Sequence, residues 1–139
     1  MAVILDANVY VSAALSSNGP SAALLRAARS GLLDVVVSPL LLSEVDGVLR
    51  RPKFRRFLLL AEVDELIDEL GRICRVEPDP ELGPAVVRDR KDDYLVYLSR
   101  DAGAECIVSG DADLTDADLD PPAISPRQAI DRFGIAEMR

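Results

Sequence analysis

Two carboxylates stand directly after apolar runs, where a solvated surface acid is not the expected residue. Asp6 follows Val3–Leu5, and Asp111 follows the run 105–109 after Gly110. Both runs are typical of strands buried on both faces, and ligands gather outside the carboxyl ends of parallel strands. Either aspartate could instead cap a helix by accepting backbone N–H hydrogen bonds. The sequence therefore leaves a ligand role and a capping role open for each.

Glu44 is a third acid at an unusual position, on a helix that Ser38-Pro39 is expected to start. An ionised carboxylate on a core-facing stripe is costly unless it is paired or bound to a cation. Glu44 would therefore either pair with an arginine, such as Arg26 or Arg50, or bind a metal ion. The residues that share its predicted stripe, at spacings of three and four, are Leu40, Leu41 and Val48.

A charged run, Asp89-Arg90-Lys91-Asp92-Asp93, leads into a helix predicted for residues 91–102. Acids at a helix N-terminus interact favourably with the helix dipole and are ordinarily solvated. This helix is also the crossover that leads to the strand before Asp111, so Asp93 is within reach of the same crevice.

Acids from four separate segments are therefore predicted to form one site. A carboxylate set in a chain without histidine offers hard oxygen ligands, which suit Mg²⁺ or Mn²⁺ better than zinc. The missing histidine also excludes Ser-His and Cys-His nucleophile pairs. Without a cation, such a density of negative charge would raise the pKa values of some acids or push them apart. The predicted metal ligands are Asp6, Glu44, Asp93 and Asp111.

The elements that must position these acids follow from the apolar pattern of the 139 residues. Short runs rich in β-branched residues alternate with helical segments, which predicts crossover units and a mainly parallel sheet. We expect one three-layer α/β/α domain over residues 1–139, with four to five strands. The expected strands are 3–5, 33–37, 73–76, 105–109 and 123–124, and the expected helices are 8–15, 21–30, 39–50, 54–71 (as one helix or two), 91–102 and 125–133.

Composition narrows the classes of function. The net charge of −8 argues against electrostatic binding of nucleic acid over the whole surface, but it permits a local basic patch. No apolar stretch approaches the roughly 20 residues that cross a bilayer, and the opening MAVIL, without a basic segment or cleavage site, is not expected to be a signal peptide. Cys74 and Cys106 lie in apolar stretches and are expected to be buried thiols of a cytoplasmic protein.

Three segments resemble PIN-domain nucleases, most of all the branch of toxins from toxin–antitoxin pairs. The similarity runs in order from Val3 to about Leu114. It rests on the combination of a D-x-N motif, an acidic helix residue, the spacing from Asp93 to Asp111 and the IVSGD strand end. Departures are mild, since Ala7 and Ser109 stand where threonine is frequent. The segments are ILDANVYVSA, SPLLLSEVDGVLRRPKF and DDYLVYLSRDAGAECIVSGDADL.

The resemblance implies a Mg²⁺- or Mn²⁺-dependent endoribonuclease whose four acids hold one or two ions. The ions would activate a water for in-line attack on an RNA phosphodiester. It also implies a cognate antitoxin and a homodimer as partners. The residues that would support the four catalytic acids are Asn8, Asp92, Ser109 and Asp113.

The segment 50–57, RRPKFRRF, is strongly basic in an otherwise acidic chain and could guide an RNA backbone. The alternative is a solvated helix junction whose arginines pair with Glu62 or Asp64. The apolar stretch Leu58–Leu60 beside it is either helix core or a patch for dimerisation or antitoxin docking. The candidate substrate-binding residues are Arg50, Arg51, Lys53, Arg55 and Arg56.

Other functions fit less well. A haloacid dehalogenase-type phosphatase would use a D-x-D motif where this chain has Asn8, which cannot serve as its general acid. That reading also leaves Glu44 unexplained. A phosphorelay receiver would need an aspartate after the third strand, where Glu77-Pro78 stands. The non-enzymatic alternative is a partner-binding module in which any metal ion is purely structural.

Overall fold

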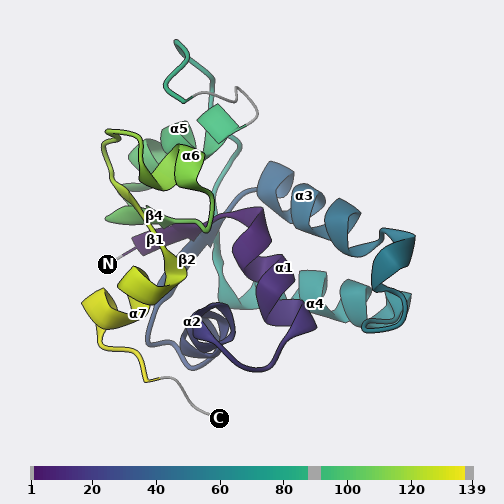
Figure 1. Cartoon of the computed structure of the whole chain (residues 1–139). Coiled ribbons are helices and arrows are strands. Elements are labelled where there is room, and N and C mark those ends of the chain that lie inside the picture. The colour runs from purple at the N-terminus through teal and green to yellow at the C-terminus, as the bar shows by residue number, and fades with distance from the viewer. Residues whose placement is uncertain (1, 88–91, 137–139) are drawn as a thin grey trace.

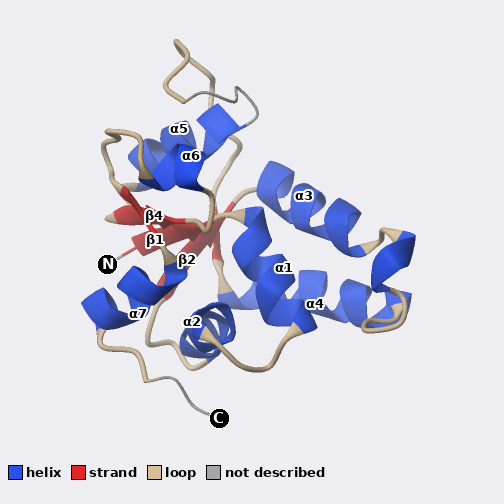
Figure 2. Cartoon of the chain, in the orientation of Figure 1, coloured by secondary structure: helices blue, strands red, loops and turns tan. Residues whose placement is uncertain are grey.

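The computed structural model describes residues 2–87 and 92–136, and shows a five-stranded sheet with helices on both faces (Figure 1, Figure 2). Neighbouring strands are parallel, in the order β3-β2-β1-β4-β5. This confirms the predicted α/β/α fold class. The strands are β1 (Ala2–Leu5), β2 (Asp34–Val37), β3 (Arg75–Val76), β4 (Cys106–Val108) and β5 (Ala123–Ile124). The helices are α1 (Ala7–Leu15), α2 (Pro20–Arg29), α3 (Pro39–Leu49), the 3-10 helix η1 (Pro52–Phe54), α4 (Leu60–Ile73), α5 (Asp93–Ala102), α6 (Ala112–Thr115) and α7 (Pro126–Phe133).

The helices form two layers around the sheet. In Figure 1, α5 and α6 lie above the strands and α2 and α7 lie below them, while α3 and α4 extend to the right as a pair. Helix α5 packs on β1 and β4, and α1 packs against both α2 and α3. Helices α1 and α3 begin directly after the neighbouring strands β1 and β2, and α5 lies against β1 and β4.

The central strands are buried along their whole length, as their continuous apolar sequences predict. All four residues of β1 and all three of β4 are buried. Their register pairs Leu5 with Val108, and the Asp6 amide donates to the Val108 carbonyl at 2.9 Å. This register places Asp6 beside Ser109, the residue that follows Val108.

Two helix starts agree with the local sequence signals. At α3 the Ser38 hydroxyl accepts a hydrogen bond from the Leu41 amide at 3.3 Å, with proline in the first turn. At α7, Ser125 and Gln128 form a reciprocal capping box. The strong local chemistry of these caps explains why their positions are predictable from sequence.

Other boundaries differ from the prediction. The one or two helices expected over 54–71 are the single helix α4, which begins only at Leu60, after the 3-10 helix η1 that starts at Pro52. The short helix α6 lies outside the helices that the sequence predicts. Helix α5 begins at Asp93, and residue 91 of its predicted range lies outside the described residues.

Two further expectations can be compared with the structure. Cys74 and Cys106 are buried and form no disulfide, which confirms them as buried thiols. In the part of the chain that the structure describes, no helix is both long and apolar enough to cross a membrane.

Candidate functional site

Asp6 and Asp111 are joined through Ser109 at the carboxyl ends of β1 and β4. The Ser109 hydroxyl donates to Asp6 Oδ2 at 2.8 Å and accepts from the Asp111 amide at 3.0 Å. Ser109 is fully buried and Asp6 is 5% exposed. The serine therefore holds one carboxylate and the backbone of the next in a fixed relation.

The capping alternative holds most clearly for Asp111. Asp111 Oδ1 accepts the Asp113 amide at 2.9 Å and so caps α6. The Asp6 side chain makes no such capping hydrogen bond to α1, all of whose residues are described, although the Ala7 and Asn8 amides at the start of that helix are near enough to lower its pKa. Asp6 therefore has the less ordinary role: it is a buried carboxylate held by a neighbouring hydroxyl.

Burial raises the pKa of Asp6 above its usual value. Hydrogen bonds from Ser109 and from the backbone amides of Ala7 and Asn8 oppose the shift, and the negative charge of Asp111 adds to it. In the absence of a cation, the ionised form of Asp6 is therefore less favourable in the folded protein than in water. A bound cation would offset this cost, so the electrostatics of Asp6 fit an ion ligand.

Glu44 does not lie on the core-facing stripe that the sequence predicts. The buried face of α3 is Leu41, Val45 and Leu49, whereas Glu44 is exposed and Leu40 is 46% exposed. Successive residues of a helix are about 100° apart, so a face centred on Val45 leaves Glu44 at its edge. The suggested pair with Arg50 is also absent from the described residues, since Arg50 pairs with Asp46 and Asp64.

A contact with α5 nevertheless brings Glu44 to the other acids. The hydroxyl of Tyr94 donates to Glu44 Oε1 at 2.9 Å. The pKa of the Tyr94 phenol is raised, first by burial and then by the charges of Glu44, Asp6 and Asp92. The three carboxylates therefore lie close enough to act on one phenol.

The two acids at the start of α5 have different surroundings. Asp93 is fully buried, and its Oδ1 accepts the backbone amides of Val86 at 3.2 Å and Val87 at 2.9 Å. Asp92 is partly exposed, and its charge acts on the Tyr94 phenol. Asp93 thus anchors the preceding loop, while the charge of Asp92 acts on the phenol that donates to Glu44.

The remaining supporting residues lie at the rim of the cluster. Asn8 is exposed in the first turn of α1, and Asp113 is exposed in α6. Among the described residues, no three acidic or cysteine side chains are close enough together to hold one metal ion. The acids meet instead at two polar side chains, Asp6 and Asp111 at Ser109 and Glu44 at Tyr94. Their oxygen donors fit Mg²⁺ or Mn²⁺ in chemical type.

The five predicted substrate-binding cations divide into two groups. Arg50 is bound to Asp46 and Asp64, and Arg55 is half-buried with its guanidinium donating to backbone carbonyls. The ion pair of Arg50 with Asp64 agrees with the alternative in which this segment is a helix junction whose arginines pair with acids. The second group is exposed and makes no ion pair within the described residues: it comprises Arg51, Lys53 and Arg56.

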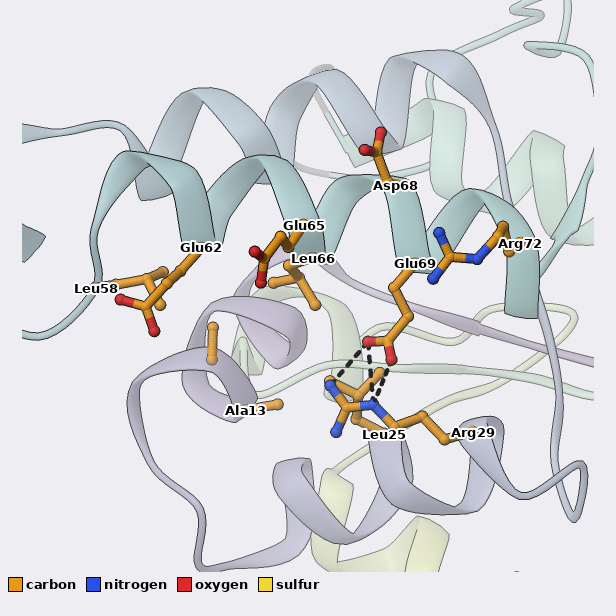
Figure 3. A pocket seen from close by; sticks show the side chains of 11 residues that line it. Ala13, Leu25, Arg29, Leu58, Glu62, Glu65, Leu66, Asp68, Glu69 and Arg72 are labelled. Carbon is orange, nitrogen blue, oxygen red and sulfur yellow. Dashed lines mark hydrogen bonds and ion pairs between the residues drawn. The ribbon is translucent and has the colours of Figure 1, made fainter.

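A groove of about 570 Å³ lies between α4 and the pair α1 and α2 (Figure 3). None of the four predicted metal ligands lines it. Leu25, Leu58 and Leu66 contribute apolar surface, and the bidentate pair of Arg29 with Glu69 spans it. Leu58 is buried, in agreement with the helix-core alternative, whereas Leu59 and Leu60 are exposed. The acidic residues along α4 that line the groove are Glu62, Glu65, Asp68 and Glu69.

Sequence reasoning did not identify Tyr94 as part of the site, because its position among apolar residues of α5 is typical of helix core. Its place directly after two aspartates is the one local signal that could have drawn attention to it.

Comparison with known proteins gives a family and a fold. A family model described as a PIN domain matches residues 2–113. No curated protein matches the sequence. Six chains of solved structures match, including the crystal structure of PAE2754 from Pyrobaculum aerophilum, with a TM-score of 0.65 and 16% sequence identity. That match covers 96% of this chain and 90% of the other chain, and it supports the fold alone.

Proposed function

This chain belongs to the PIN-domain family of nucleases, and on that premise we propose that it is a Mg²⁺- or Mn²⁺-dependent endoribonuclease. The observation that carries the proposal is the link from Asp6 through Ser109 to Asp111 across the ends of β1 and β4. Tyr94 adds Glu44 from α3 to the same region. The family match favours this reading over a phosphatase.

The ion ligands that we propose are Asp6, Glu44, Asp111 and, at the start of α5, Asp92. One or two bound ions would lower the pKa of a bound water and neutralise negative charge at the phosphate. Ser109 keeps the Asp6 carboxylate in one orientation by donating to Oδ2. To Asn8, exposed and two residues after Asp6, we assign the orientation of water beside that carboxylate.

This assignment differs from the sequence-based one at one position. Asp93 remains a candidate from the sequence pattern, but its Oδ1 already accepts two backbone N–H groups in a buried setting. We therefore assign Asp93 to holding the loop around Val86 and Val87, and its neighbour Asp92 to the ions.

Metal dependence tests the proposal directly. Purified protein should cleave RNA, offered in single-stranded and structured forms, when Mg²⁺ or Mn²⁺ is present. Cleavage should stop with EDTA and return when excess metal is added, since the protein offers no nucleophile pair of its own. Gel analysis of labelled RNA gives the readout. Activity that persists in EDTA, or metal-dependent hydrolysis of p-nitrophenyl phosphate without RNA cleavage, would contradict the proposal.

The exposed cations Arg51, Lys53 and Arg56 are the part of the basic segment that we assign to the RNA backbone. Each phosphate contact to a single strand contributes about 0.7 to the slope of log affinity against log salt. Replacing all three cations by glutamine should therefore lower that slope by about 2 and weaken binding. Fluorescence anisotropy with labelled RNA in EDTA, over a series of KCl concentrations, measures both quantities.

A charge-matched variant provides the control for this prediction. Arg29, Arg75 and Arg132 are each held in surface ion pairs elsewhere on the molecule. Glutamine at these three positions removes the same total charge, and such pairs contribute little to stability. An equal loss of RNA affinity in both variants would show that net charge matters and that the segment 51–56 has no special role.

The toxin role, the antitoxin, the homodimer and a cytoplasmic location stay predictions from the sequence and its family. The groove along α4 is the surface on which we would place an antitoxin. Its apolar wall and the carboxylates of Glu62, Glu65 and Asp68 suit a basic segment that carries apolar side chains. The exposed Leu59 and Leu60 beside it would extend the apolar contact.

A further inference from the structure

Tyr94 on α5 contacts Glu44 on α3, a residue 50 positions away in the sequence. It lies in the first turn of α5 and is 4% exposed. Its hydroxyl donates to Glu44 Oε1 at 2.9 Å, on α3. This hydrogen bond joins the helix that carries Glu44 to the helix that follows Asp92.

Glu44 needs such a contact to be an effective ion ligand. It is exposed and lies outside the buried face of α3, so packing does not hold its side chain. Ordering a free glutamate side chain costs conformational entropy. In the described part of the chain, the Tyr94 hydroxyl is the side-chain donor that meets this carboxylate.

A phenol also suits this position chemically. The phenol of tyrosine keeps its proton at neutral pH, so its hydroxyl donates to the Glu44 carboxylate. A lysine or arginine at the same place would hold the carboxylate but would neutralise its charge. The neutral phenol leaves the negative charge of Glu44 available to a cation.

We propose that Tyr94 is a positioning residue, whose hydroxyl fixes the Glu44 carboxylate in the orientation that binds the metal ion. It does so without itself contacting RNA or the reacting water. The inference rests on the proposed function, in which Glu44 is an ion ligand.

Tyr97 provides a matched control on the same helix. Its hydroxyl donates to the Pro84 carbonyl at 2.7 Å and so serves the loop before α5, not the acids. Tyr94→Phe and Tyr97→Phe each remove one hydroxyl from α5 and leave the aromatic ring in place.

The test measures Mn²⁺ binding by titration calorimetry without RNA, together with the metal dependence of cleavage. Losing a hydrogen-bond partner of a metal ligand typically weakens metal affinity about 10- to 100-fold. Tyr94→Phe should show such a loss, and Tyr97→Phe should bind as the wild type does. Saturating Mn²⁺ should restore most of the cleavage rate of Tyr94→Phe, because the ligands themselves remain. Urea unfolding checks that both variants are folded.

A double variant separates positioning from a general structural role. In a Glu44→Gln background, Tyr94→Phe should cause no further loss of Mn²⁺ affinity, because its effect passes through Glu44. An equal further loss there would overturn the inference, as would wild-type affinity in Tyr94→Phe alone. If the wild type itself binds no Mn²⁺, the proposed function fails, and the inference fails with it.

Discussion

Asp6→Asn should strongly reduce RNA cleavage while making the metal-free protein more stable. Asparagine has nearly the same shape and can still accept the Ser109 hydrogen bond, but it lacks the charge that binds a cation. Metal ions supply several kcal/mol of transition-state stabilisation, and each 1.4 kcal/mol is a factor of ten in rate. We therefore expect the cleavage rate to fall about 1000-fold or more at fixed Mg²⁺.

The stability gain follows from the pKa of Asp6. Because burial raises this pKa in the folded state, the folded protein holds the proton more tightly than the unfolded chain does. The stability contribution of Asp6 is therefore complete below the unfolded value of 3.8 and is lost as pH rises through the folded pKa. At pH 7 in EDTA, Asp6→Asn avoids that loss and should unfold at higher urea than the wild type. The difference should narrow as pH approaches 3.8.

Added Mn²⁺ should reverse this order, since a ligand that binds the folded state stabilises it. The wild type should gain stability from the ion, and Asp6→Asn should gain much less. Asp131→Asn removes an equal charge from an exposed position on α7 and should match the wild type in both assays. If Asp6→Asn cleaves RNA at the wild-type rate, Asp6 is not an ion ligand.

Replacing Asp92 should reduce RNA cleavage, whereas removing the Asp93 side chain should reduce the stability of the protein. Asp92→Asn should lower the cleavage rate about 100-fold or more, because it removes an ion ligand. Its effect on the free energy of unfolding should stay within about 0.5 kcal/mol, as for other partly exposed positions. Asp93→Asn keeps an oxygen acceptor for the Val86 and Val87 amides and should retain cleavage.

Asp93→Ala tests the structural role of the buried carboxylate. It leaves two backbone N–H groups without their acceptor, and each such loss costs about 1–3 kcal/mol. We expect a loss of about 2–4 kcal/mol in the free energy of unfolding, allowing for partial access of water to these amides. Urea unfolding and RNA cleavage on the same preparations give both readouts. Loss of cleavage in Asp93→Asn with wild-type activity in Asp92→Asn would return the ligand role to Asp93.

The amino-acid sequence by itself determined the fold class and the ends of the central strands. The apolar runs before Asp6 and Asp111 are contiguous in the chain, and their pattern needs no partner to be interpreted. The helix starts at Ser38 and Ser125 are equally local, since a hydroxyl caps the amide three residues ahead. Because β1 and β4 pair in parallel, the residues that follow them, Asp6 and Ser109 to Asp111, lie at the same edge of the sheet.

Only the tertiary structure decided how the helical residues face one another. Consecutive helix positions differ by about 100°, so the choice between Asp92 and Asp93, or the exposure of Glu44, depends on how α3 and α5 pack. The same holds for the basic segment, where ion pairs with Asp46 and Asp64 occupy Arg50 and leave Arg51 exposed. The Tyr94 contact to Glu44 spans 50 residues and joins two helices. No local pattern encodes it, because it arises from the packing of both helices around the sheet.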